Sequence, residues 1–466
     1  MRRALALWLV LLAAYAATLG VHQQPGLRVS ARETHELLTA ESIVSDGDVD
    51  LRDEYRAGDW KRFGGPAVKP TAGLVHGRLV ESQGAGFPLL IAPAYAIGGR
   101  TAVRLWLAAI VALGFVAAAA LARRLVPDPW ATGAALVAGL SPPVVAAATS
   151  ISPEGVGGTA LAAAALGALA VREHPATKRL AFASAAAIAI APWLAVSLVP
   201  AAAVCAVVLA RWLRRRQRAL AALVALEVIL TSGVIFVTIH DRLYGGLTPY
   251  ASSLAAHATT GAASLGDHLS RAPRLVGVFL DRDAGLLRWS PFAALALVAV
   301  WLLWRSRRDR LAMAVSEQID VEVAGGFLVA VCATQVAAAA FLAPSLHGPW
   351  APARLLLPAV PVGTALAALA LRHAPRIGGA LAAITLAGTM WLLAGPRIGY
   401  ATLAPPRGDV PWGGAQDVLP VFSGTVGTGE AIAIAIVVAG LVALVVSEWR
   451  GWGSSRRPPP LGAPQL

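Results

Sequence analysis

Long uninterrupted apolar runs are the feature that most limits what this chain can fold into. About 20 apolar helical residues span the roughly 30 Å of hydrocarbon in a bilayer, where every backbone polar group needs a partner within the protein. Such runs cover residues 4–20, 101–121, 131–149, 155–171, 180–193, 196–211, 219–239, 286–304, 324–343, 353–371, 377–394 and 430–447. The sequence therefore predicts an all-α integral membrane protein, a polytopic bundle of about 12 transmembrane helices.

Composition agrees with a membrane location. The chain is 57% hydrophobic and 14% charged, whereas a soluble domain carries about 25% charged residues. Residues 1–450 are predicted to form a single transmembrane domain, and residues 451–466, which are rich in proline, a disordered cytoplasmic tail. A net charge of +13 could indicate a nucleic-acid partner, but its distribution indicates membrane topology and membrane lipids instead.

The basic residues divide unevenly between the two sides of the predicted bundle. With the amino terminus inside, the inner side, counting Glu227 in its span, holds 21 of the 39 Lys and Arg residues and 8 of the 26 acidic residues. The outer side then has 18 basic and 18 acidic residues and is neutral. This bias predicts a multi-pass protein of a bacterial-type plasma membrane with both termini cytoplasmic. The first apolar run, with Arg2 and Arg3 before it, also fits a cleavable signal peptide.

Polar sequence is concentrated in three outer loops, residues 21–100, 240–285 and 395–429. In the first loop, residues 32–44 are predicted to form an amphipathic helix on the membrane surface. An acidic stretch at residues 46–54 follows. It fails the EF-hand pattern, because Leu51 and Ala57 occupy positions six and twelve. A solvated acidic turn is the simpler interpretation.

Several charged residues lie at predicted outer span ends. Glu154 follows a proline at a helix start, where it could cap the helix or act in a site. Arg288 and Arg354 could snorkel to the interface or bind a lipid phosphate. His347 precedes Arg354 in a loop, where a lone histidine could act as a ligand or have only a structural role.

Six short motifs occur in order across residues 30–365. They read RETHELLTAESIVSDGDVDL (32–51), ESQGAGFPLLIAPAYAIGG (81–99), ISPEG (151–155), APWLAV (191–196), AGLLRWSPF (284–292) and WAPARLLLPAVP (350–361). Together they resemble the GT-C superfamily of membrane glycosyltransferases, which includes protein O-mannosyltransferases and lipid A aminoarabinose transferases. In the first motif, Arg32 stands where the family has an aspartate, while the adjacent Glu33 and His35 remain. Glu36 stands in place of the family tyrosine.

The resemblance implies transfer of a sugar from a polyprenyl-phosphate-linked donor to a glycan, lipid or protein acceptor at the outer membrane face. It implies a carboxylate base from the first loop, for which Glu33 is the candidate and His35 a further first-loop candidate. Glu154 is the second carboxylate, orienting the acceptor or a divalent metal ion, whose requirement stays open. The implied ligands of the lipid phosphate are Lys69, Arg288, Arg354 and, in support, His347.

Two other functions stay open. A non-catalytic relative would bind a polyprenyl lipid or help to assemble the cell envelope. A transporter would show inverted repeats and charges at mid-membrane, but no repeat is evident, and Glu227 is the one clear acidic residue within a predicted span. The large outer loops favour the first two functions.

Overall fold

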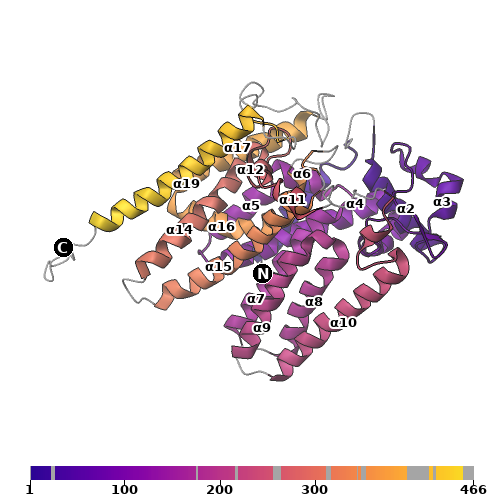
Figure 1. The fold of residues 1–466 in the computed structure, drawn as a ribbon, viewed down its shortest axis with the longest axis horizontal. Helices are drawn as coiled ribbons and strands as arrows, with labels where there is room; N and C mark the ends of the chain where they lie inside the picture. The colour runs from indigo at the N-terminus through magenta and orange to yellow at the C-terminus, as the bar shows by residue number, and fades with distance from the viewer. Residues whose placement is uncertain are drawn as a thin grey trace.

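The chain folds into a bundle of helices with a group of short elements at one end (Figure 1). This computed structural model describes residues 2–21, 27–174, 177–215, 219–254, 264–310, 316–343, 345–347, 353–395, 419–422 and 427–454. Within these ranges the one sheet is a pair of two-residue antiparallel strands. The predicted all-α membrane fold class is confirmed.

The first outer loop has a structure of its own, which follows α1 (Arg2–Ala16). It contains α2 (Ala31–Ser45), α3 (Arg52–Ala57), the 3-10 helix η1 (Asp59–Phe63) and the strands β1 (Leu74–Val75) and β2 (Arg78–Leu79). The helix predicted over residues 32–44 is α2. Its Leu37 and Leu38 are fully buried, so they pack inside the protein and do not lie on the membrane surface as predicted. Burial against the other first-loop elements and α4 removes these side chains from lipid.

Seven segments are long and apolar enough to cross a membrane, and a helix pair bent by 62° adds an eighth if it counts as one span. The seven are Gly86–Ala122, Pro153–Glu173, Val196–Arg215, Ala219–Ser252, Asp320–Leu342, Arg354–His373 and Pro375–Ala394, and the bent pair is α5 (Trp130–Gly139) with α6 (Pro142–Ala148). Helices also overlie the other four predicted spans, namely α1, α8 (Lys178–Leu194), α14 (Ala294–Arg310) and α19 (Thr428–Ser454). The number twelve stays a prediction.

The first long helix, α4 (Gly86–Ala122), is kinked within its length. Gly98 and Gly99 leave helical geometry, and Gly99 has φ +57°, which favours glycine. The apolar run before the kink is therefore the first half of α4. The second half is the predicted span over residues 101–121.

The remaining long helices are α7 (Pro153–Glu173), α9 (Val199–Arg215), α10 (Ala219–Tyr244), α15 (Ser316–Ala337), α16 (Val360–His373) and α17 (Pro375–Ala394). Of these, α16 lies deepest in the bundle, against α4, α5, α7 and α14. Exposed apolar side chains line α10, such as Leu230 and Val234, as expected of a helix that faces lipid.

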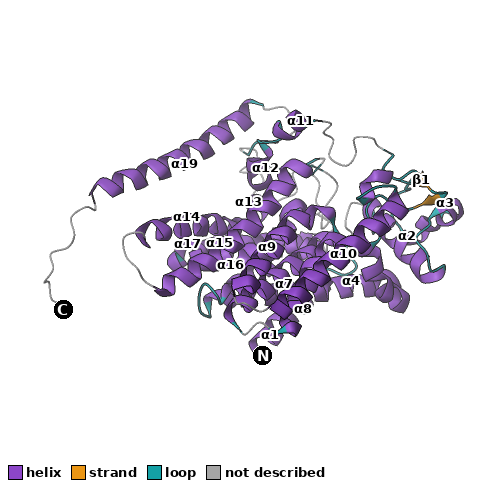
Figure 2. Ribbon diagram, turned by 60° about the horizontal axis from the view of Figure 1, so that its bottom comes forward, coloured by secondary structure: helices purple, strands orange, loops and turns teal. Residues whose placement is uncertain are grey.

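Short helices cap one side of the bundle. They are η3 (Pro249–Ser252), α11 (Leu265–Leu269), α12 (Arg274–Leu280), α13 (Leu286–Trp289), η4 (Pro291–Ala293), the π-helical η5 (Ala338–Leu342) and η6 (Arg354–Ala359). In Figure 2, α11 and α12 lie near the top of the view and the N-terminus lies at the bottom. Most of the predicted third outer loop, residues 396–418 and 423–426, and residues 455–466 of the tail lie outside the described residues.

A close approach of backbones fixes α7 against η6 and α16. A Cβ atom added at Gly158 would lie 3.2 Å from the carbonyl oxygen of Leu357 and 3.1 Å from a ring carbon of Pro361. Small residues permit such contacts between membrane helices. Gly158 is one helical turn after Glu154, and Leu357 is one turn after Arg354, so this contact sets the distance between those two charged residues.

Candidate active site

The first turns of α2 point successive polar side chains at different neighbours. A capping box begins the helix: the Ser30 hydroxyl accepts a hydrogen bond from the backbone N–H of Glu33, and the Glu33 carboxylate accepts one from the backbone N–H of Ser30. Arg32 and Glu36 lie four residues apart and therefore share one face of the helix. Glu33 and His35 point to other partners.

Arg32 and Glu36 meet Glu154 and Arg354 in a group of four that we call the Arg–Glu cluster. Glu154, in the first turn of α7, accepts hydrogen bonds at Oε1 from Nε and Nη2 of Arg354, at 2.8 and 2.7 Å. The same oxygen lies 3.1 Å from Nη1 of Arg32. On the other side, Nε of Arg32 lies 3.8 Å from Oε1 of Glu36. Segments far apart in sequence, α2, α7 and η6, therefore bring two guanidinium groups and two carboxyl groups together.

Burial sets the electrostatics of the cluster. The Glu36 side chain is 3% exposed, and burial, opposed by Arg32 and reinforced by Glu154 and Glu81, raises its pKa to about 8. Burial lowers the pKa of Arg32, but Glu154 and Glu36 more than offset this and raise it above its ordinary value. At neutral pH Glu36 is therefore largely protonated and contributes little negative charge beside the two guanidinium groups. This balance suits an anionic ligand.

Glu33 contacts backbone groups, away from the Arg–Glu cluster. Besides the Ser30 N–H, its carboxylate accepts a hydrogen bond of 2.8 Å from the backbone N–H of Ile151 and one of 3.4 Å from the Ser150 hydroxyl. Arg104 lies 4.0 Å away. The Glu33 side chain is 2% exposed. These contacts join the start of α2 to the segment that precedes α7, and so position both Arg32 and Glu154.

His35 belongs to a buried network in the first loop. Its Nδ1 lies 2.6 Å from the Tyr55 hydroxyl and 3.4 Å from Oε1 of Glu81. Tyr55 and Thr71 donate hydrogen bonds to Glu81. Burial raises the pKa of Glu81, but the hydrogen bonds from His35, Thr71 and Tyr55 hold that pKa below its ordinary value. The network ties α2 to α3 and to the segment before α4.

His347 is held in a second group, around Asp281. Its Nε2 lies 3.0 Å from Oδ2 of Asp281, which also accepts from the backbone N–H of Phe422. The backbone N–H groups of Asp283 and Ala284 donate to the other oxygen. Asp281, Asp283 and His347 are close enough to hold a metal ion. Both Asp281 oxygens accept hydrogen bonds, so the group joins the segments around Asp281, His347 and Phe422 even without a metal ion.

The other two predicted phosphate ligands lie apart from the Arg–Glu cluster. Lys69 is exposed in the first loop. Arg288 is buried, with Nη1 3.9 Å from Asp283 and the guanidinium stacked 5.2 Å from the ring centre of Trp289. Leu346, next to His347, lines a small cavity together with Arg354. The Asp281 group and the Arg–Glu cluster are therefore neighbours, and Lys69 belongs to neither.

Sequence patterns alone did not identify Glu36 or Glu81 as site residues. For Glu36, the available signal was its spacing of four residues from Arg32, which places both side chains on one face of a helix. No local pattern indicates that Glu81 meets His35, because that contact depends on how the first loop folds.

Comparisons with known proteins agree with this architecture. No family model matches the chain, and no curated protein matches its sequence. Among solved structures, ArnT from Cupriavidus metallidurans bound to undecaprenyl phosphate superposes with a TM-score of 0.50 at 15% identity, over 95% of this chain and 69% of ArnT. The chain is similar in fold to ArnT. The apo state of ArnT matches with a TM-score of 0.49 at 16% identity, over 95% of this chain and 70% of ArnT. The predicted resemblance to a family of membrane proteins is therefore confirmed at the level of the fold alone.

Proposed function

We propose that this protein is a glycosyltransferase that moves a sugar from a polyprenyl-phosphate-linked donor to an acceptor at the outer membrane surface. The observation that carries the proposal is the Arg–Glu cluster, two guanidinium groups converging on Oε1 of Glu154 where α2, α7 and η6 meet. The ArnT structure with undecaprenyl phosphate bound supports a lipid phosphate as the donor's anionic group. Guanidinium groups are well suited to binding phosphate oxygens.

The reaction needs a proton acceptor and charge stabilisation on opposite sides of one carbon. The acceptor hydroxyl gives its proton to a carboxylate as its oxygen bonds to the anomeric carbon. The bond from that carbon to the phosphate oxygen breaks, and polyprenyl phosphate leaves with the bonding electrons. Arg354 and Arg32 stabilise the developing phosphate charge, while Glu154 orients both guanidinium groups.

The base is proposed to come from α2. Glu33 is the residue that the family motif names, and its role as base stays a prediction. Glu36 has the stronger geometric support, because its carboxyl lies beside a guanidinium of the Arg–Glu cluster, whereas the Glu33 carboxylate lies 4.0 Å from Arg104 and bonds to backbone N–H groups outside the cluster. Phosphate contacts by Lys69, Arg288 and His347 likewise stay predictions.

Transfer by the purified full-length protein is the direct test. The protein in lipid nanodiscs is incubated with labelled polyprenyl-phosphate sugars and candidate acceptors, with and without divalent metal. We expect E154Q and E36Q each to lower transfer by about 10²–10⁴-fold, and R354A to weaken binding of polyprenyl phosphate. E41Q is the matched control, a buried glutamate of α2 outside the cluster, and it should transfer normally. Full activity of both E154Q and E36Q would overturn the proposed site.

A binding protein without catalysis is the second candidate function. It is favoured by Arg32, which occupies the family's aspartate position and pairs with Glu154. The variant R32D separates the two functions. Transfer by the natural protein, or increased transfer by R32D, supports the enzyme. Binding of polyprenyl phosphate without transfer by either form supports the binding protein.

Membrane orientation is proposed from the charge bias, with both termini cytoplasmic. Labelling of single cysteines in intact cells tests it. An impermeant reagent should not reach a cysteine at Arg215 from outside, and should reach one at Asp241. The opposite pattern would reverse the topology and place the Arg–Glu cluster on the inner side.

A further inference from the structure

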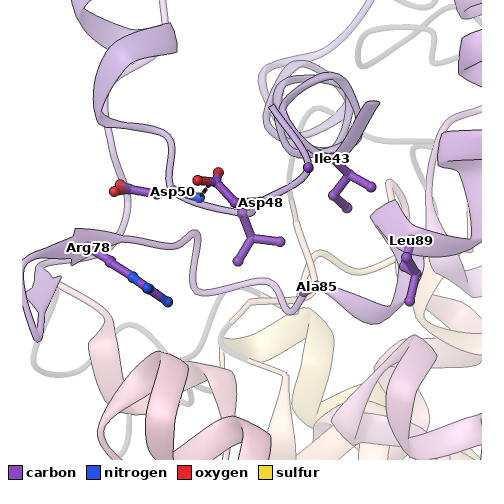
Figure 3. A pocket seen from close by; sticks show the side chains of 8 residues that line it. Ile43, Asp48, Asp50, Arg78, Ala85 and Leu89 are labelled. Atoms are coloured by element: carbon purple, nitrogen blue, oxygen red, sulfur yellow. Dashed lines mark hydrogen bonds between the residues drawn. The ribbon is translucent and has the colours of Figure 1, made fainter. Parts of the chain in front are cut away.

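The acidic stretch between α2 and α3 divides into two sets of carboxylates. Asp48 and Asp50 have partners: the Asp48 carboxylate accepts from the Ser42 hydroxyl and from the backbone N–H of Asp50, and the Asp50 carboxylate accepts from Arg52 and from the backbone N–H of Leu79. These contacts fold the stretch into a tight loop. Asp48 and Asp50 also line one wall of a cavity of about 360 Å³, and Arg78 and Leu89 are among the residues that line the rest of it (Figure 3).

The other three carboxylates converge on one point, and one of them, Asp46, accepts a hydrogen bond from the Ser45 hydroxyl. Asp46 caps the end of α2, and Asp53 and Glu54 lie in the first turn of α3. One oxygen from each lies within 4.8 Å of the oxygens of the other two. Asp46 and Asp53 are exposed, whereas Glu54 is 4% exposed. The group therefore has a buried floor and an opening to solvent.

Glu54 is the carboxyl that distinguishes this group from a fully solvated acidic turn. Both of its carboxylate oxygens are buried, and neither has a hydrogen-bond partner of ordinary geometry in the described part of the chain, although the side chains of Asp53 and Ser42 lie close to it. No Lys or Arg of the described ranges forms an ion pair with any of the three carboxylates, and Arg52, in the same turn of α3, is directed to Asp50. Burying an unpaired carboxylate beside two others is costly. A bound cation would remove that cost.

We propose that Asp46, Asp53 and Glu54 form a Ca²⁺ site. Carboxylate oxygens are the hard ligands that Ca²⁺ prefers, and its flexible coordination accepts ligands from an irregular loop with water at the remaining positions. Mg²⁺ demands near-ideal octahedral geometry, which a helix end and a short helix are less suited to supply. The site differs from an EF-hand in using one residue before the loop and two after it.

A bound ion would join the end of α2 to the start of α3. Asp46 is the residue after α2, whose first turn carries Arg32 of the Arg–Glu cluster. The ion would also fix the loop that lines the cavity in Figure 3. Its expected role is therefore to stabilise the first outer loop, whether or not the protein is an enzyme.

Calorimetric titration of the full-length protein in detergent with CaCl₂, and separately with MgCl₂, tests the site. We expect saturable binding of one Ca²⁺ that is tighter than binding of Mg²⁺. Changes in the second shell of a metal site already cost about 10–100-fold in affinity, so D53N and E54Q, which remove direct ligands, should weaken Ca²⁺ binding by at least about tenfold. D241N, which removes an exposed carboxylate elsewhere, should bind as the natural protein does.

Thermal unfolding supplies a second measurement, because the difference in unfolding temperature between E54Q and the natural protein should change sign when Ca²⁺ is added. In chelator, E54Q should unfold at a higher temperature than the natural protein, because it removes a buried unpaired charge. In Ca²⁺ the order should reverse, because only the natural protein gains the binding energy. The proposal would be overturned if the natural protein showed no saturable Ca²⁺ binding. It would also be overturned if D53N and E54Q bound Ca²⁺ as tightly as the natural protein does.

Discussion

The hydrogen-bonded pair of Glu154 and Arg354 should be among the strongest single interactions in the protein. Both side chains are largely buried, with 14% of the glutamate and 10% of the arginine exposed. Hydrogen bonds to charged groups contribute about 1.5–3 kcal/mol each, and two join this pair. Removing one member leaves the other charge buried, which costs about 3–5 kcal/mol.

A double-mutant cycle isolates this interaction. E154Q keeps an acceptor oxygen and the neighbouring Arg32 is one-third exposed, so we expect E154Q and R354Q each to lose about 2–4 kcal/mol of unfolding free energy. The double variant should lose about 2 kcal/mol less than the sum of the two, because each single variant already removes the interaction between them. Unfolding by SDS in mixed micelles gives the three values.

Asp50 and Arg52 provide the control cycle, because half of the Arg52 side chain is exposed and surface ion pairs contribute little. Their coupling should be far smaller. A coupling below about 0.5 kcal/mol between E154Q and R354Q would refute the reasoning, since independent sites add within that error. Glu154 and Arg354 would then be no more than two charged groups near each other.

Three further outcomes are expected. Because burial and nearby carboxylates raise the pKa of Glu36 to about 8, transfer that uses it as base should rise as pH passes through about 8, and E36Q should lack this rise; an unchanged pH profile in E36Q would exclude that role. The same shift means that the folded state keeps a proton the unfolded chain loses, so stability should fall as pH rises from 4.5 to about 8, and E36Q should lack this slope in thermal unfolding. G158A should lower stability by about 1–3 kcal/mol by forcing α7 from η6, whereas G133A, with open space around it, should not; equal stabilities would show that the contact is unimportant.

Membrane character and the positions of the helices were predictable because hydrocarbon thickness imposes a length that apolar runs reveal directly. The kink at Gly98 and Gly99 was predictable only as a break between two apolar runs. Glu154 and Arg354 could be named from their places at span ends, but their contact depends on how α7 packs against η6. Ser30 and Glu33 have the spacing of a capping box, but a catalytic carboxylate requires the same residue type, so this pattern alone did not decide the direction of the Glu33 side chain.

The kink in α4 divides the helix into two halves, of which the second carries the contacts to the first outer loop. Just after the kink, Arg100 donates a hydrogen bond to the carbonyl of Phe63, and Arg104 donates one to the carbonyl of Arg28. The first outer loop is therefore attached to the membrane-spanning half of α4. A thinner or thicker bilayer changes the tilt of such a span. We expect the loop, and Arg32 with it, to tilt in step with that half, while the half before Gly98 keeps its own angle, so that lipid chain length becomes a determinant of how α2 meets α7.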